Sequence, residues 1–221
     1  QVDAVELPPI LDARAGALSN KTIASVVSSA RLSAAAGLTE ESVELTWESV
    51  RGARKPGLHI LLPASPVQME YMCHKKGPAM LELARALVGR ARYFTEQVEF
   101  SALDATRAEP EFLHQLLSAA LEAGASAVTV CDSAGIMTPG ECAGFIRSLY
   151  EAVPGLEKVL LGVELSDGLH MASACAAAAC ISSKNCPSIS LSLDSSSISR
   201  RISKTRSLAS LFLERISSCR F

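Results

Sequence analysis

The chain has 221 residues, of which 48% are apolar, 20% charged and 5% aromatic, and its mean hydropathy is +0.24. Its 21 basic and 23 acidic residues give a net charge of −2, which argues against a dedicated nucleic-acid-binding protein. No apolar run reaches the roughly 18 residues that a transmembrane helix needs, and no secretory signal pattern is recognisable. We therefore expect a cytoplasmic globular protein that binds neither nucleic acid nor membrane.

The seven cysteines do not suggest a disulfide framework. Their number is odd, no CxxC pair occurs, and several lie in apolar runs, as Cys131, Cys175 and Cys180 do. Such cysteines behave as small buried apolar residues more often than as bridges or metal ligands.

Composition changes near residue 181. Residues 182–221 carry seven basic and two acidic residues and 14 serines, whereas residues 1–181 carry 14 basic and 21 acidic residues and all 13 glycines. Two different kinds of sequence are therefore joined there. We divide the chain into a domain, residues 1–181, and a basic, serine-rich tail, residues 182–221.

The first 181 residues alternate between short apolar runs and helical patterns. A weaker run, RLSAAAGL, falls at residues 31–38, where the rhythm requires a further strand. Apolar residues spaced three and four apart predict helices over residues 78–92 and 113–121, and a third after Thr138-Pro139. The clear runs of strand length cover residues 2–7, 58–62, 98–100, 127–131 and 159–163.

Successive strands start about 30 to 40 residues apart, which is the length of a βα unit in a parallel sheet. A Rossmann-type sheet would carry GxGxxG after a strand, and the sequence has none. The repeated units therefore predict an α/β fold of the (β/α)8 TIM-barrel type, whose chemistry lies at the carboxyl ends of its strands.

Polar side chains recur where these predicted strands end. Recurring acidic residues suit a cation or a polar ligand at the mouth of a barrel. Asp and Ser also cap helices, and for any one residue taken alone a cap is the better interpretation. Their recurrence over several strands favours a site for the set. The set comprises Glu6, His59, Glu99, Ser101, Asp104, Arg107, Asp132, Ser133, Glu164, Ser166 and Asp167.

Three segments resemble one known family in the same order and spacing. They are VRGARKPGLHILLPASPVQMEYM (50–72), VEFSALDATRAEPEFL (98–113) and VTVCDSAGIMTPGE (128–141). They look like 2-isopropylmalate synthase and its relatives, the homocitrate and citramalate synthases and, more distantly, hydroxymethylglutaryl-CoA lyase. The resemblance covers roughly residues 1–181.

The resemblance implies a cytoplasmic TIM-barrel acyltransferase, usually a homodimer, that acts in amino-acid biosynthesis such as leucine biosynthesis. Such an enzyme condenses an acyl-CoA with a 2-oxo acid, and a divalent Mg, Mn or Zn ion polarises the 2-oxo acid. His59 matches a histidine that lines the family's substrate pocket, and Ser133 keeps the hydroxyl of its pocket threonine. Leu103 replaces a family glutamate, so Asp104 is the nearest acid. The substrate-binding residues that it implies are His59, Ser101, Asp104, Arg107, Asp132 and Ser133.

The family's metal ligands are poorly matched. Its first strand, with a DTTLRDGEQ-like motif, has no counterpart, because the chain begins at the family's second strand; such a motif upstream would favour an enzyme, and its absence a pseudoenzyme. Its HxHND stretch corresponds to residues 164–168, where Glu164 and Ser166 replace the histidines. Glu164 and Asp167 are the remaining metal candidates. A single carboxylate with water ligands holds Mg²⁺ weakly. We therefore expect the chain alone to bind divalent metal on the order of millimolar at best, and not to turn over acetyl-CoA.

The tail leaves two explanations open, a reading-frame or gene-model error and a divergent native ending. Its composition predicts poor order, with at most one amphipathic helix near residues 207–216 and a last strand that is absent or divergent. The expected fold is thus an incomplete barrel. Three functions follow as alternatives: an acyltransferase of this family in its complete form, a metal-less binding paralogue, and an inactive fragment.

Overall fold

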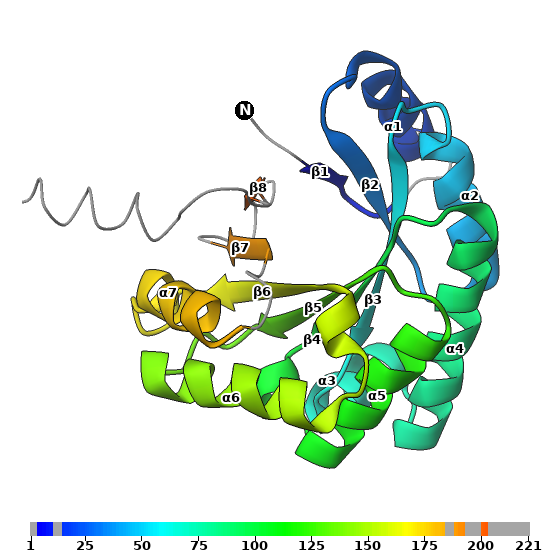
Figure 1. Ribbon diagram of the computed structural model, residues 1–221. Helices are drawn as coiled ribbons and strands as arrows, with labels where there is room; N and C mark the ends of the chain where they lie inside the picture. Colours follow the sequence, from blue (N-terminus) through cyan, green and yellow to red (C-terminus); the bar gives the residue numbers. More distant parts are fainter. Residues whose placement is uncertain (1–3, 11–14, 184–187, 193–199, 203–221) are drawn as a thin grey trace, which may run out of the picture.

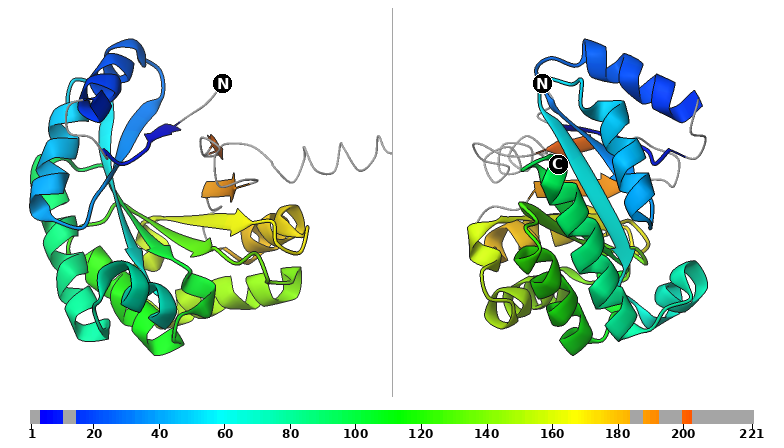
Figure 2. Two further views of the ribbon diagram at one scale, coloured as in Figure 1. Left: turned by 180° about the vertical axis from the view of Figure 1, so that it is seen from behind. Right: turned by 90° about the vertical axis from the view of Figure 1, so that its right-hand side faces the viewer.

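The computed structural model describes residues 4–10, 15–183, 188–192 and 200–202. Its strands and helices alternate along the chain, as the sequence predicts, and Figure 1 shows the strands curling into a barrel wall. The longer helices lie along the outer side of this curled sheet (Figures 1 and 2). The first six strands are β1 (Ala4–Leu7), β2 (Arg31–Ala36), β3 (Pro56–Pro63), β4 (Val98–Leu103), β5 (Ala127–Asp132) and β6 (Leu160–Ser166).

Helices follow the strands in sequence and cover them. The main ones are α1 (Ala15–Val26), α2 (Glu40–Val50), α4 (Gly77–Phe94), α5 (Pro110–Glu122), α6 (Pro139–Ala152) and α7 (Ala172–Ser182). Shorter turns are α3 (Pro66–Gln68), the π-helical η1 (Met69–Cys73) and the 3-10 helices η2 (Ala105–Arg107) and η3 (Leu156–Lys158). The poor strand sequence at residues 31–38 does form β2, because its alanines lie between two neighbouring strands.

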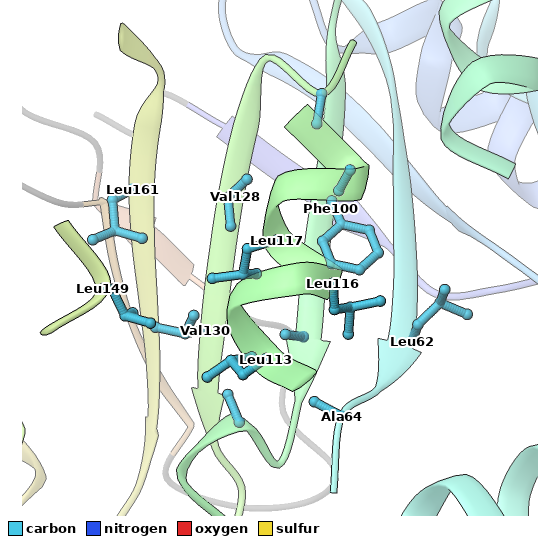
Figure 3. Close-up of a cluster of buried hydrophobic side chains, with 14 of the residues drawn as sticks. Leu62, Ala64, Phe100, Leu113, Leu116, Leu117, Val128, Val130, Leu149 and Leu161 are labelled. Atoms are coloured by element: carbon cyan, nitrogen blue, oxygen red, sulfur yellow. The ribbon is translucent and has the colours of Figure 1, made fainter. Parts of the chain in front are cut away.

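Strands β1 to β6 pair in parallel and in sequence order, which confirms the predicted TIM-barrel type of fold. Every second residue of a strand points outward, toward the helices. Figure 3 shows this on β4 and β5, where Phe100, Val128 and Val130 face side chains of α5 such as Leu117. The main core is therefore the layer between sheet and helices, and the opposite face of each strand is left for the barrel interior.

The tail corrects one expectation. Residues 188–192 form a strand, β7 (Ser188–Ser192), that pairs in parallel with β6, although we expected no strand there. The sequence Ser-Ile-Ser-Leu-Ser alternates apolar and polar residues, which is a strand pattern that the high serine content conceals. The expected helix near residues 207–216 lies outside the described residues.

A last short strand, β8 (Arg200–Ile202), pairs with both β7 and β1 and so completes the ring of hydrogen-bonded strands. Both of its pairings are antiparallel. A (β/α)8 barrel has eight parallel strands. The barrel is therefore incomplete as a repeat of βα units.

Candidate active site

The barrel interior of this chain is lined by polar side chains. Bulky branched residues fill the interior of most TIM barrels. Phe100 on β4 points outward (Figure 3). Its neighbours Glu99 and Ser101 therefore lie on the inner face of the same strand. The same alternation places acidic, hydroxyl and thiol groups on the inner faces of the neighbouring strands. The inner-face polar residues of the described strands include Glu6, Ser33, His59, Glu99, Ser101, Thr129, Cys131, Glu164 and Ser166.

Three of these side chains form one hydrogen-bonded line across the interior. The Glu6 carboxylate contacts Nδ1 of His59, and Nε2 of the same ring lies 2.6 Å from Oγ of Ser101. His59 is 1% exposed and Ser101 is fully buried. Because a carboxylate can only accept, Nδ1 donates to Glu6, and in the tautomer that leaves Nε2 unprotonated this nitrogen accepts from the serine hydroxyl.

A second carboxylate lies on the other side of the imidazole. Oε1 of Glu99 is 4.0 Å from Nε2 of His59 and accepts a hydrogen bond of 2.6 Å from the Thr129 hydroxyl. The register pairs His59 with Glu99 across β3 and β4 and Ser101 with Thr129 across β4 and β5. Neighbouring parallel strands thus hold this polar group in place.

Glu164 and Cys131 form the next contact around the barrel. The thiol donates to Oε2 of Glu164 at 3.7 Å. Burial, and then the negative charge of Glu164, raise the pKa of Cys131 well above its ordinary value. Burial, and then the charge of Glu6, raise the pKa of Glu164, while His59 acts in the opposite direction. The thiol therefore stays protonated at neutral pH.

Asp104 and Arg107 lie outside this interior line, in the loop after β4. Asp104 is fully buried with a left-handed backbone, φ 54°. Its carboxylate accepts from Nε of Arg107 at 2.8 Å and from Nη2 at 2.8 Å. This hydrogen bond and the negative charge of Asp104 raise the pKa of Arg107 further above its already high ordinary value. The Arg107 side chain remains 47% exposed.

Asp132 and Ser133 tie the loop after β5 to the loop after β4. Ser133 Oγ accepts from the backbone N–H of Asp104 at 3.1 Å. Asp132 accepts from the Thr106 hydroxyl at 2.9 Å and from the backbone N–H of Gly135 at 3.2 Å. The six predicted substrate-binding residues thus divide into an interior pair, His59 and Ser101, and a loop network of Asp104, Arg107, Asp132 and Ser133.

The predicted metal candidates are not brought together. Glu164 contacts Cys131, whereas Asp167 accepts from the backbone N–H of Ala172 at 3.0 Å and lies 3.5 Å from Nδ1 of His170. Within the residues that the structure describes, no group of three or more His, Cys, Asp or Glu side chains could hold a metal ion. The described donor set therefore does not fit a divalent metal. In the same part of the chain, no helix is long and apolar enough to cross a membrane.

Glu6 and Glu99 were predicted at strand ends without a role, and Thr129 was not among the predicted site residues. Cys131 was interpreted as a small apolar residue, although it donates to a carboxylate. The signal that could have found them is strand alternation. In Val-Glu-Phe-Ser, the fully buried Phe100 faces the helices, so Glu99 and Ser101 must share the inner face.

The raised pKa of Glu164 predicts how the free energy of unfolding changes with pH. A native pKa above the unfolded value gives a contribution that is full at low pH and is lost as the pH rises through the native pKa. Glu164→Gln stays neutral at every pH. We therefore expect its unfolding free energy to gain on that of the wild type as the pH rises from the ordinary carboxyl range through the raised pKa of Glu164. Urea denaturation at several pH values measures this, with the exposed Glu151→Gln on α6 as control. A difference that does not change with pH would contradict it.

Comparisons with known proteins show the family of this chain. A family model described as HMGL-like matches residues 5–185, so the chain belongs to the HMGL-like family. Among curated relatives, the chain is 38% identical over 152 residues to 2-isopropylmalate synthase from Pelotomaculum thermopropionicum, covering 69% of this chain and 30% of that protein. It is 35% identical over 154 residues to the enzyme of the same name from Clostridium kluyveri, covering 70% and 30%. The chain thus spans about 30% of the length of these relatives.

Solved structures show the same fold. Hydroxymethylglutaryl-CoA lyase from Pseudomonas aeruginosa superposes with a TM-score of 0.59 at 15% identity, over 80% of this chain and 72% of that one. The HMG-CoA lyase from Brucella melitensis gives 0.60 at 11% identity, over 86% and 66%. At these identities the likeness is one of fold, and it supports the incomplete TIM barrel described above.

Proposed function

We propose that this chain is the partial catalytic barrel of a 2-isopropylmalate-synthase-like acyltransferase. In its complete form this enzyme would condense an acyl-CoA with a 2-oxo acid and form a carbon–carbon bond. The observation that carries the proposal is the 38% identity to a 2-isopropylmalate synthase, within an HMGL-like match that spans residues 5–185. A cytoplasmic homodimer that serves leucine biosynthesis is part of the same proposal.

In this proposal the interior pair binds the 2-oxo acid. Glu6 holds the His59 ring through Nδ1, so that Nε2 and the Ser101 hydroxyl point at one another inside the barrel. The Ser101 hydroxyl can turn away from Nε2 and donate to an incoming oxygen, while Nε2 is then free to accept from a substrate O–H. Arg107, half exposed in the loop after β4, supplies positive charge for a carboxylate, and the buried Asp104 fixes its guanidinium.

The loop network positions the strand ends around that pocket. Asp132 accepts from donors in two different loops, and Ser133 accepts from the Asp104 backbone. Such supporting hydrogen bonds hold binding groups within a narrow range of geometries. We assign Asp104 and Asp132 to this positioning role, with Ser133 at the edge of the binding pocket.

The described residues give no step that passes through a metal ion. We expect Mg²⁺, Mn²⁺ or Zn²⁺ to bind this chain on the order of millimolar at best, because Glu164 and Asp167 are engaged at separate places. Calorimetric titration of the chain tests this expectation. A stoichiometric micromolar site that disappears in Glu164→Ala would contradict it and would show a carboxylate-based site.

The separation of Glu164 from Asp167 also favours a second candidate function. This candidate is a metal-less paralogue that keeps the barrel and binds a ligand without condensing it. Glu164 stands where the family has a histidine, and its carboxylate accepts a hydrogen bond from the Cys131 thiol. A paralogue of this kind would bind 2-oxo acids and show no turnover with acyl-CoA.

Thiol release separates the two candidates. The full gene product is supplied with acetyl-CoA and a panel of 2-oxo acids, and free CoA is measured with a thiol reagent. The acyltransferase proposal predicts release that depends on one 2-oxo acid and falls at least about 100-fold in His59→Ala. If calorimetry detects binding of a 2-oxo acid but no thiol is released, the acyltransferase proposal is overturned in favour of the paralogue.

A further inference from the structure

The interior line of Glu6, His59 and Ser101 has the order of groups that activates a serine hydroxyl. A nucleophile must contact a base, and the base must be oriented by a third group on its other side. Ser101 Oγ lies 2.6 Å from Nε2 of His59, and the Glu6 carboxylate contacts Nδ1 of the same ring. Such a constellation is recognised by geometry and roles, whatever the fold that carries it.

Rigid elements hold all three groups. Glu6 lies on β1, His59 on β3 and Ser101 on β4, and the register pairs β3 with β4 residue by residue. Constellations built on strands keep their geometry better than those built on loops. His59 and Ser101 are 1% and 0% exposed, so the proton transfer between them takes place away from bulk water.

The neighbouring thiol does not compete with the serine. Cysteine attacks as its thiolate, and burial together with Glu164 raises the pKa of Cys131 well above its ordinary value. Its proton is directed at Glu164, at 3.7 Å. Cys131 contacts a carboxylate, whereas Ser101 lies within hydrogen-bond distance of an imidazole nitrogen.

We propose that Ser101 is the nucleophile of a second activity, the hydrolysis of short-chain carboxyl esters, with His59 as general base and Glu6 as the group that orients it. The acyl group must be short because Ser101 is fully buried inside the barrel. This activity goes beyond the condensation proposed above, since it requires neither an acyl-CoA nor a 2-oxo acid.

The reaction consists of two balanced halves. Ser101 Oγ attacks the ester carbonyl carbon as its proton passes to Nε2 of His59; the bond from that carbon to the alcohol oxygen breaks, and His59 returns the proton to the leaving alcohol. Water then attacks the acyl-serine, giving its proton to Nε2. The bond from carbon to Oγ breaks, the carboxylic acid leaves, and Oγ regains a proton. The sum is ester and water giving acid and alcohol, with no oxidant or reductant.

The test uses the full chain and p-nitrophenyl acetate. We expect an initial burst of p-nitrophenol stoichiometric with protein, and an acetyl group on the peptide that contains Ser101 by mass spectrometry. Ser101→Ala should remove the acetyl adduct. Ser101→Ala and His59→Asn should each lower the rate of ester hydrolysis at least about 100-fold. The double variant should be no slower than either single one, because the two residues act as a unit.

Two further variants separate chemistry from folding. Glu6→Gln should lower kcat about tenfold or more with little change in KM, since the ring loses its orienting carboxylate. Ser49→Ala removes a buried serine from α2, away from the barrel interior, and should leave the rate unchanged. If Ser101→Ala does not fold, labelling of the wild type with a fluorophosphonate decides, since the proposal requires the label on Ser101. The esterase proposal is overturned if the label or acetyl group is found only on other residues, or if the rate is unchanged in Ser101→Ala. Neither result affects the test by thiol release with a 2-oxo acid.

Discussion

Replacing Phe100 by Ala is expected to lower the free energy of unfolding by about 3–5 kcal/mol, the range typical of large aromatic deletions in a core. Phe100 is fully buried on the outer face of β4, against the side chains of α5 (Figure 3). The cavity left there would lie between two rigid elements, which limits relaxation. Urea denaturation followed by circular dichroism measures the loss.

The control for this prediction is Tyr71→Ala, which removes an aromatic side chain that is 79% exposed on η1. Surface substitutions of this kind usually change stability by no more than about 0.5 kcal/mol. A loss below about 1 kcal/mol for Phe100→Ala would contradict the packing of β4 on α5.

Gly135→Ala is expected to destabilise the protein by about 3 kcal/mol or more, through left-handed strain and overpacking together. Gly135 has φ +63°, and an added Cβ would lie 2.4 Å from the backbone N of Gly168 and 2.5 Å from the carbonyl O of Ser166. Both are backbone atoms, which cannot move aside cheaply. The substitution would therefore push apart the loops after β5 and β6, where Asp132 and Asp167 lie.

A matched substitution makes the same chemical change without the clash. Gly144 lies inside α6 with nothing within 4 Å of the added Cβ. Alanine there should stabilise the helix by about 0.5–1 kcal/mol. Thermal denaturation of both variants tests the pair, and equal effects at the two positions would contradict the close approach of the two loops.

The barrel could be predicted because its signals are local. Apolar runs at regular intervals, and helices with one apolar face such as α5, follow from periods that the sequence displays directly. The strand β7 was not predicted, because the high serine content of residues 182–221 was weighed more heavily than the alternation of polar and apolar residues at 188–192. Five residues alternating Ser with Ile or Leu form a strand once β6 offers an unpaired edge.

The site was only partly predictable, because its contacts join residues far apart in the chain. Glu6 and His59 are 53 positions apart, and His59 and Ser101 are 42 apart. Strand ends and the family resemblance nominated His59 and Ser101 together with Asp104 and Asp132. Only three-dimensional placement separates the interior pair from a network that ties loops to one another.

Proton-detected long-range ¹⁵N NMR of the His59 ring tests most directly whether Glu6, His59 and Ser101 form one hydrogen-bonded line. We expect a single tautomer with the proton on Nδ1, a Nδ1 resonance that shifts in Glu6→Gln, and a Nε2 resonance that shifts in Ser101→Ala. A ring that averages between tautomers and responds to neither substitution would contradict it.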